Sequence, residues 1–152
     1  MKNFFKGFFN KPISQEPATS NSVLLSAISL MIEVSLADEI MDISELETLK
    51  KVLLNEFEVK ENDLENLISD AKKNQNSSTS LYEFTRKIND EYEFDDKKNL
   101  ILSMWKIAYA DGNIDKYEEY VIRKVSDLIY ISHPDFIKSK QKAKREYENR
   151  KT

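Results

Sequence analysis

The sequence of 152 residues contains no cysteine, one histidine, two glycines and three prolines. The absence of cysteine excludes disulfides, thiolate metal sites and a cysteine nucleophile. The scarcity of histidine and glycine excludes a histidine-based triad and a glycine-rich phosphate loop, so we expect no enzymatic activity. Sheets and barrels need more turn residues, and the composition therefore favours a helical protein. No apolar run reaches the roughly 18 residues of a membrane-spanning helix.

Hydrophobic residues make up 40% of the chain, and eight phenylalanines, seven tyrosines and one tryptophan are available to fill a core. Charged residues make up 33%, and the net charge of −4 is unevenly distributed. Residues 1–20 carry +2 and residues 138–152 carry +5, which leaves −11 on residues 21–137. Such an acidic body repels nucleic acid and attracts cations or basic proteins. We therefore expect a cation or protein partners, and no nucleic acid.

The chain divides into a tail with a linker, residues 1–21, and a helical domain, residues 22–152. Residues 10–21 are polar and contain two prolines, which is typical of a linker. From residue 22 onward, apolar residues recur at helical spacing. The pattern predicts an all-α bundle of about seven helices, which begin near Ser22, Asp42, Glu61, Ser80, Asp95, Asp115 and Ser132.

An acidic pattern occurs twice, 73 residues apart, and each copy lies between two expected helices. The copies read Ala37-Asp38-Glu39-Ile40-Met41-Asp42-Ile43-Ser44-Glu45 and Ala110-Asp111-Gly112-Asn113-Ile114-Asp115-Lys116-Tyr117-Glu118. The helices around them follow the same plan, which indicates two related three-helix halves joined by a fourth helix. Such halves often pack about a pseudo-twofold axis, which could bring the two acidic turns close together; the sequence permits this closeness but does not show it.

Four of these acids have a structural explanation. Asp42 and Glu45, like Asp115 and Glu118, stand at the N-cap and N3 positions of a capping box. In such a box the Asp accepts a hydrogen bond from the backbone and the Glu reaches back to the N-cap N–H. Loss of such a cap usually costs about 1 kcal/mol.

Capping does not account for Asp38 and Asp111, which lie near the C-terminus of the preceding helix. The helix dipole disfavours a negative charge there, so each needs a cation, a basic side chain or a free backbone N–H. The stretch from Asp111 to Glu118 also matches the later part of an EF-hand loop. Ile107 and Tyr109 occupy the earlier ligand positions, which excludes a true EF-hand. Two readings stay open: caps alone, or caps that also form a weak cation site.

Part of the chain resembles the TerB-like family, which is named for tellurite-resistance operons. The resemblance covers about residues 22–140 and rests on the first acidic copy and, above all, on Trp105-x-x-Ala108-Tyr109-Ala110-Asp111-Gly112-x-Ile114-Asp115-x-x-Glu118. It implies an all-helical duplicated fold and a role in stress-response or tellurite-resistance systems. No established catalysis comes with it.

The resemblance also implies metal binding through the acidic turns. The candidate ligands, carried over by position, are Asp38, Asp42, Glu45, Asp111, Asp115 and Glu118. Oxygen ligands favour calcium or magnesium over zinc. The family's glycine after the first Asp is present as Gly112 but is replaced by Glu39 in the first copy. Glycine takes a positive φ without strain, so we expect the first turn to differ in shape.

The N-terminal tail carries four phenylalanines that would share one side of a helix, with lysines beside them: Phe4, Phe5, Phe8 and Phe9, and Lys2 and Lys6. That arrangement suits shallow insertion at an anionic membrane surface. The alternatives are a tail packed on its own domain or on a neighbour, and simple disorder. We expect a cytoplasmic protein whose partners belong to a stress-response complex, with peripheral contact at the inner face of the membrane as one of the roles open to the tail.

Overall fold

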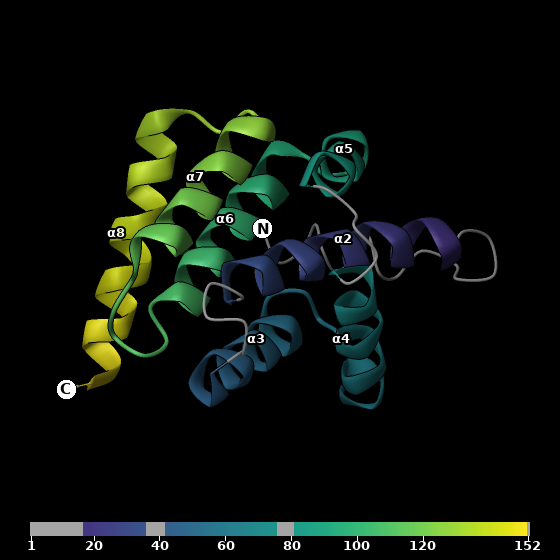
Figure 1. Ribbon diagram of the computed structural model, residues 1–152, viewed down its shortest axis with the longest axis horizontal. Helices are drawn as coiled ribbons and strands as arrows, with labels where there is room; N and C mark the ends of the chain where they lie inside the picture. Colours follow the sequence, from purple (N-terminus) through teal and green to yellow (C-terminus); the bar gives the residue numbers. More distant parts are fainter. Residues whose placement is uncertain (1–16, 36–41, 76–80, 152) are drawn as a thin grey trace.

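The computed structural model describes residues 17–35, 42–75 and 81–151, and these segments form helices joined by short turns (Figure 1). The described residues contain no strand, which confirms the all-α prediction. The helices are α2 (Pro17–Ser35), α3 (Ile43–Asn55), α4 (Glu61–Gln75), α5 (Leu81–Glu91), α6 (Phe94–Ala108), α7 (Lys116–Leu128) and α8 (His133–Lys151).

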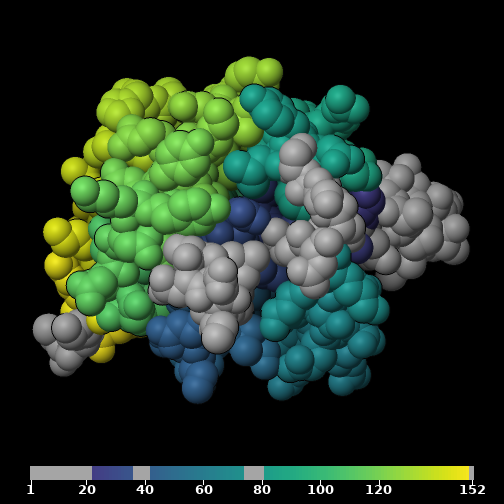
Figure 2. Space-filling view, viewed as in Figure 1, coloured from purple at the N-terminus to yellow at the C-terminus, as the bar shows by residue number. Residues whose placement is uncertain are grey.

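Helix α2 lies at the centre of the bundle and contacts α4, α5, α6 and α7. Its apolar residues occur on all sides, and residues such as Val23, Ile28, Met31 and Val34 have no exposed surface. A helix that is hydrophobic all round is stable only when it is enclosed. On the face shown in Figure 2, the coloured part of α2, residues 22–35, is visible as small patches.

Helix α2 begins at Pro17, so the predicted start at Ser22 is wrong. Proline is favoured in the first turn of a helix. The backbone N–H that it lacks would have no helical partner there, and its φ is already helical. The polar composition of residues 17–21 therefore indicated a linker where the backbone is already helical.

Helix α6 forms the second centre and contacts α2, α3, α7 and α8. Leu100, Ile101, Met104 and Trp105 are fully buried. The Trp105 ring packs against Phe136 of α8, with 5.3 Å between the ring centroids. Figure 1 shows α6, α7 and α8 together at one end of the molecule, with α3 next to them and α4 beyond α3, below α2 in this view.

The segments α2–α4 and α6–α8 share several local features. Helices α3 and α7 both begin with a capping box. Both are followed by a non-glycine residue with a positive φ, Glu58 at 54° and Tyr130 at 65°. These features agree with two similar halves, while the duplication itself stays a prediction.

Candidate functional site

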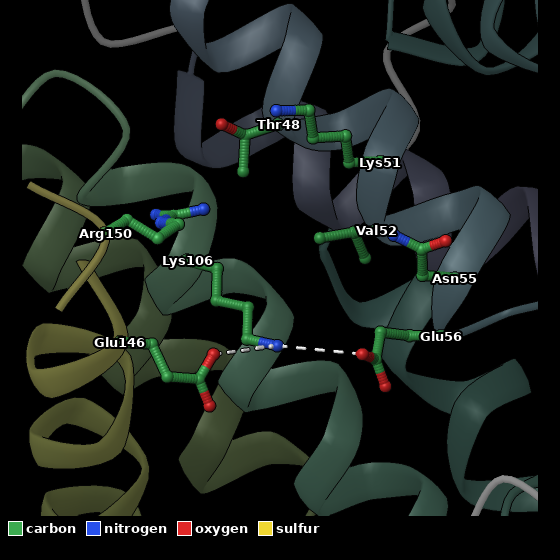
Figure 3. Close-up of a pocket in the computed structure, with 8 residues that line it drawn as sticks. All are labelled: Thr48, Lys51, Val52, Asn55, Glu56, Lys106, Glu146 and Arg150. Carbon is green, nitrogen blue, oxygen red and sulfur yellow. Dashed lines mark ion pairs between the residues drawn. The ribbon is translucent and has the colours of Figure 1, made fainter.

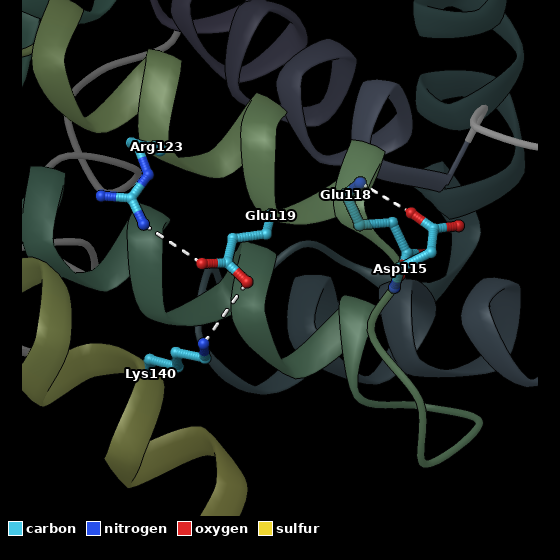
Figure 4. A network of polar contacts seen from close by, with 5 residues as sticks. All are labelled: Asp115, Glu118, Glu119, Arg123 and Lys140. Carbon is cyan, nitrogen blue, oxygen red and sulfur yellow. Dashed lines mark hydrogen bonds and ion pairs between the residues drawn. The ribbon is translucent and has the colours of Figure 1, made fainter.

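The second acidic turn connects α6 to α7 and holds its acids with backbone hydrogen bonds. The Glu118 N–H donates to Asp115 Oδ1 at 2.8 Å, and the Asp115 N–H donates to Glu118 Oε1 at 3.1 Å (Figure 4). The capping box predicted at this turn is confirmed. It satisfies two N–H groups that the start of α7 leaves without helical partners.

Asp111 lies in the same turn, where the sequence required some compensation for its charge. Its Oδ1 accepts a hydrogen bond from the Asn113 N–H at 3.0 Å. Of the three compensating partners considered above, the described contact is thus a backbone N–H. The position of Asp111 does not by itself demand a cation.

Gly112 gives this turn its shape, and α8 packs directly against it. Its φ is +91°, and a Cβ added there would lie 2.7 Å from Tyr147 Oη. A side chain would therefore meet both backbone strain and a steric clash. The Gly112 N–H donates to the Tyr109 carbonyl at 2.9 Å, which closes the turn.

The first acidic turn is described only from Asp42 onward. The Ser44 N–H donates to Asp42 Oδ1 at 3.1 Å, and the Asp42 N–H donates to Glu45 Oε1 at 3.3 Å. The predicted capping box at the start of α3 is confirmed. Asp38 and Glu39 lie outside the described residues, so the ligand role of Asp38 and the expected difference in turn shape stay predictions.

The two turns meet through their capping glutamates. Glu45 is 4% exposed and Glu118 is 6% exposed, and the two side chains hydrogen-bond to each other. One carboxyl must carry a proton for this bond to form, because an ionised carboxylate is an acceptor only. The structure thus joins the two acidic turns through a buried carboxyl pair.

Burial governs the titration of this pair. Desolvation raises the pKa of Glu118 to about 8, and its hydrogen bond to Glu45 and the charge of Asp115 act in the same direction. Desolvation also raises the pKa of Glu45, while the bond to Glu118 opposes the rise. The negative charge of Asp111 reaches Glu45 across the two turns and adds to the rise. Such a pair shares one proton near neutral pH.

The donor set of the two turns consists of oxygens, which suits a hard cation such as calcium or magnesium. Among the residues the structure describes, however, no group of three or more acidic or histidine side chains is arranged to hold a metal ion. Of the six candidate ligands, Glu45 and Glu118 are in direct contact, and Asp42, Asp111 and Asp115 contribute negative charge beside them. Any cation would therefore need further oxygens from Asp38, the backbone or water.

Sequence reasoning missed a second polar cluster, which joins α7 to α8 (Figure 4). Glu119 lies 3.1 Å from Arg123 and 3.5 Å from Lys140. The Lys140 ammonium also lies 5.3 Å from the centre of the Trp105 ring. The four-residue spacing of Glu119 and Arg123 indicates the first contact, but no sequence signal links Glu119 to Lys140.

The four phenylalanines of the tail, Phe4, Phe5, Phe8 and Phe9, lie outside the described residues, so membrane contact stays a prediction. In the described part of the chain, no helix has the length and apolar character needed to cross a bilayer.

Fold and site together define an all-helical bundle in which two capped acidic turns meet beside a buried core. The chain belongs to the tellurite resistance protein TerB family, whose model matches residues 24–141. That span includes both acidic turns and ends within α8. Comparison with curated proteins and with solved structures gave no significant match.

Proposed function

We propose that this TerB-family protein is a non-enzymatic protein that binds or senses a divalent cation through its two acidic turns. The contact between Glu45 and Glu118 carries the proposal, because it joins the turns into one acidic centre. In this function the cation replaces the shared proton. The bound state is then passed to protein partners of a stress-response or tellurite-resistance system.

The capping hydrogen bonds are compatible with a bound cation. Each box uses one oxygen per carboxylate, such as Asp115 Oδ1 and Glu118 Oε1. The second oxygen of each carboxylate stays outside the box. Calcium takes about six to eight oxygens, so both turns and several waters would contribute and binding would be weak. The buried pair favours such a cation, since a positive charge offsets the repulsion that burial strengthens.

The turns are also placed to pass a signal on. Glu45 and Glu118 belong to the first turns of α3 and α7, so neutralising the pair acts on the start of two core helices. Exposed apolar side chains lie next to the boxes: Ile43 is 74% exposed, Tyr117 45% and Tyr120 56%. A partner docked there would respond to the state of the pair, and the phenylalanine tail would add peripheral membrane contact.

A second function is a metal-independent interaction module. The observation in its favour is that backbone N–H groups already bond to the acids of both caps and to Asp111. In that case the acidic surface and the exposed Tyr117 and Tyr120 would bind basic protein partners directly.

Calorimetric titration of resin-treated, metal-free protein with calcium, magnesium, manganese and zinc separates the two functions. The test variant is Asp111→Asn/Asp115→Asn, because asparagine caps a helix about as well as aspartate. The matched control is Asp70→Asn, which removes an exposed acid of α4 away from the turns. Saturable binding that the test variant loses and the control keeps supports a cation site. Absence of heat at millimolar metal would reduce the turns to caps and favour the interaction module.

A further inference from the structure

A polar cleft lies between α3 on one side and α6 and α8 on the other (Figure 3). It consists of an inner hollow of about 120 Å³ and an adjoining outer hollow of about 250 Å³. Thr48, Lys51 and Arg150 line both hollows, which makes them one continuous cleft. Drug-sized ligands occupy sites of roughly 300–1,000 Å³, so this cleft suits a small ligand or one group of a larger one.

The positive charges of the cleft differ in their partners. Lys106 at the inner end is neutralised by Glu56 at 3.8 Å and Glu146 at 3.3 Å. Lys51 and Arg150 form no ion pair with any carboxylate that the structure describes. In Figure 3 the Lys51 ammonium lies beside Thr48 on the α3 side of the cleft, and the Arg150 guanidinium lies on the α8 side. Two cationic groups that form no described ion pair thus lie at a concave surface that Glu47, Glu56 and Glu146 also line.

Arg150 lines both hollows and also stacks on an aromatic ring. Its guanidinium lies 5.9 Å from the centre of the Tyr147 ring, and Tyr147 Oη packs against Gly112. Stacking on an aromatic ring keeps the planar donors of an arginine oriented while leaving their edge available. The cleft therefore offers the oriented guanidinium of Arg150 and the flexible ammonium of Lys51.

We propose that this cleft binds a phosphate group, held between Lys51 and Arg150. A phosphate monoester carries about −1.5 to −2 charges at neutral pH, which matches two cations. Arginine binds phosphate oxygens with paired N–H donors, and lysine binds them as a point charge. The acidic body repels a long polyanion such as nucleic acid, so the ligand is a small phosphate compound or a single headgroup. The proposal does not rest on the proposed cation function, although Ser44 and Ala110 of the two acidic turns line the outer hollow.

Glu47 provides a second test of anion binding, because this exposed carboxylate lines the outer hollow. Its carboxylate opposes an anion bound at Lys51, one helical turn away. The Glu47→Gln variant should therefore bind phosphate more tightly than the unchanged protein. A cleft that binds no anion would show no such gain.

The test is a titration of resin-treated, full-length protein with inorganic phosphate and then glycerol 3-phosphate, followed by amide NMR shifts. We expect saturable shifts at amides near Thr48 and Arg150. Hydrogen bonds to charged groups contribute enough that Lys51→Gln/Arg150→Gln should raise the Kd about tenfold or more. The matched control, Lys50→Gln/Arg145→Gln, removes the same charges from the same helices outside the cleft, and should change the Kd less than about twofold.

A second arm identifies the source of the phosphate group. Sedimentation with phosphatidic acid/phosphatidylcholine vesicles is compared with phosphatidylcholine vesicles alone. Binding to the former that Lys51→Gln/Arg150→Gln abolishes assigns a lipid headgroup, and binding of the soluble phosphates alone assigns a small molecule. The proposal is overturned if neither soluble phosphate gives saturable shifts at tens of millimolar, or if the cleft and control variants lose binding equally.

Discussion

Two adjacent residues of α7, Glu118 and Glu119, occupy opposite electrostatic settings (Figure 4). Glu119 is 36% exposed and pairs with Arg123 and Lys140. Glu118 is 6% exposed, and its side-chain partner is another carboxyl, that of Glu45. In the described residues no cation offsets the buried pair. The charge of Glu119 is already neutralised by its ion pairs. The Glu45–Glu118 pair has no such counter-charge in the described part of the chain, so a proton or a metal ion would stabilise it.

The largest effect on stability should come from removing the carboxyl group of Glu118, one of the two members of the buried pair. The pKa of Glu118 is raised from 4.5 to about 8, so the folded protein holds this proton more tightly than the unfolded chain. The resulting stability is complete below about pH 4.5 and is lost as the pH rises through about 8. Glu118→Gln keeps the capping box and should weaken this pH dependence, by a difference on the order of a few kcal/mol.

Denaturant unfolding at intervals between pH 5 and pH 9 measures this effect. The matched control is Glu119→Gln, which removes the neighbouring, neutralised carboxylate and should leave the pH dependence close to that of the unchanged protein. Equal slopes for Glu118→Gln and the unchanged protein would show that the buried pair does not titrate as described.

The next effect concerns the turn that positions Glu118. Gly112→Ala places a Cβ 2.7 Å from Tyr147 Oη at a φ of +91°. We expect a loss of about 1–2 kcal/mol in the free energy of unfolding, measured by denaturant titration. In a Tyr147→Phe background the hydroxyl is gone, and the same change should cost less. An equal cost in both backgrounds would mean that Tyr147 does not restrict the turn.

A smaller effect separates the cap from the charge at Asp115. Asp115→Ala removes the acceptor of the Glu118 N–H and should lower the free energy of unfolding by about 1 kcal/mol. Asp115→Asn retains an acceptor and should cost little. Its loss of charge should also lower the pKa of Glu118, since Asp115 helps to raise it. Chemical denaturation of both variants at pH 7 checks this order, and equal losses would contradict it.

The smallest effect should come from the neutralised cluster. Lys140→Gln removes one of two partners of Glu119, and partly exposed ion pairs usually contribute about 0.2–1 kcal/mol. The loss in thermal stability should shrink as salt is added, because salt screens the pair. A salt-independent loss would assign the role of Lys140 to its packing on Trp105 instead.

The sequence was sufficient for features that depend on local chemistry. Helical periodicity predicted the all-α bundle, and the spacing of Asp42 to Glu45 and of Asp115 to Glu118 predicted both capping boxes. The family match over residues 24–141 confirms the resemblance. The prediction that the first helix begins at Ser22 was wrong. Residues 17–21 are polar and begin with a proline, so their composition resembles that of a linker.

The sequence permitted the two acidic turns to lie close together, but it could not show which side chains of distant segments meet. Glu45 and Glu118 belong to different helices, and their contact depends on how α3 and α7 pack around α2 and α6. The same holds for Lys140, which reaches Glu119 from α8. The cleft between α3 and α8 is likewise a product of packing, since nothing near Lys51 in the sequence indicates that Arg150 faces it.

The most direct test of this account is a carbon-13 NMR titration of the glutamate carboxyl groups, with and without millimolar calcium. We expect one carboxyl that titrates near pH 8 in the metal-free protein, that is absent from Glu118→Gln, and that titrates at lower pH when calcium is present. A cation that competes with the shared proton must lower this pKa. Ordinary pKa values for every glutamate, or a raised value that calcium leaves unchanged, would contradict the claim that the joined turns form a cation-responsive centre.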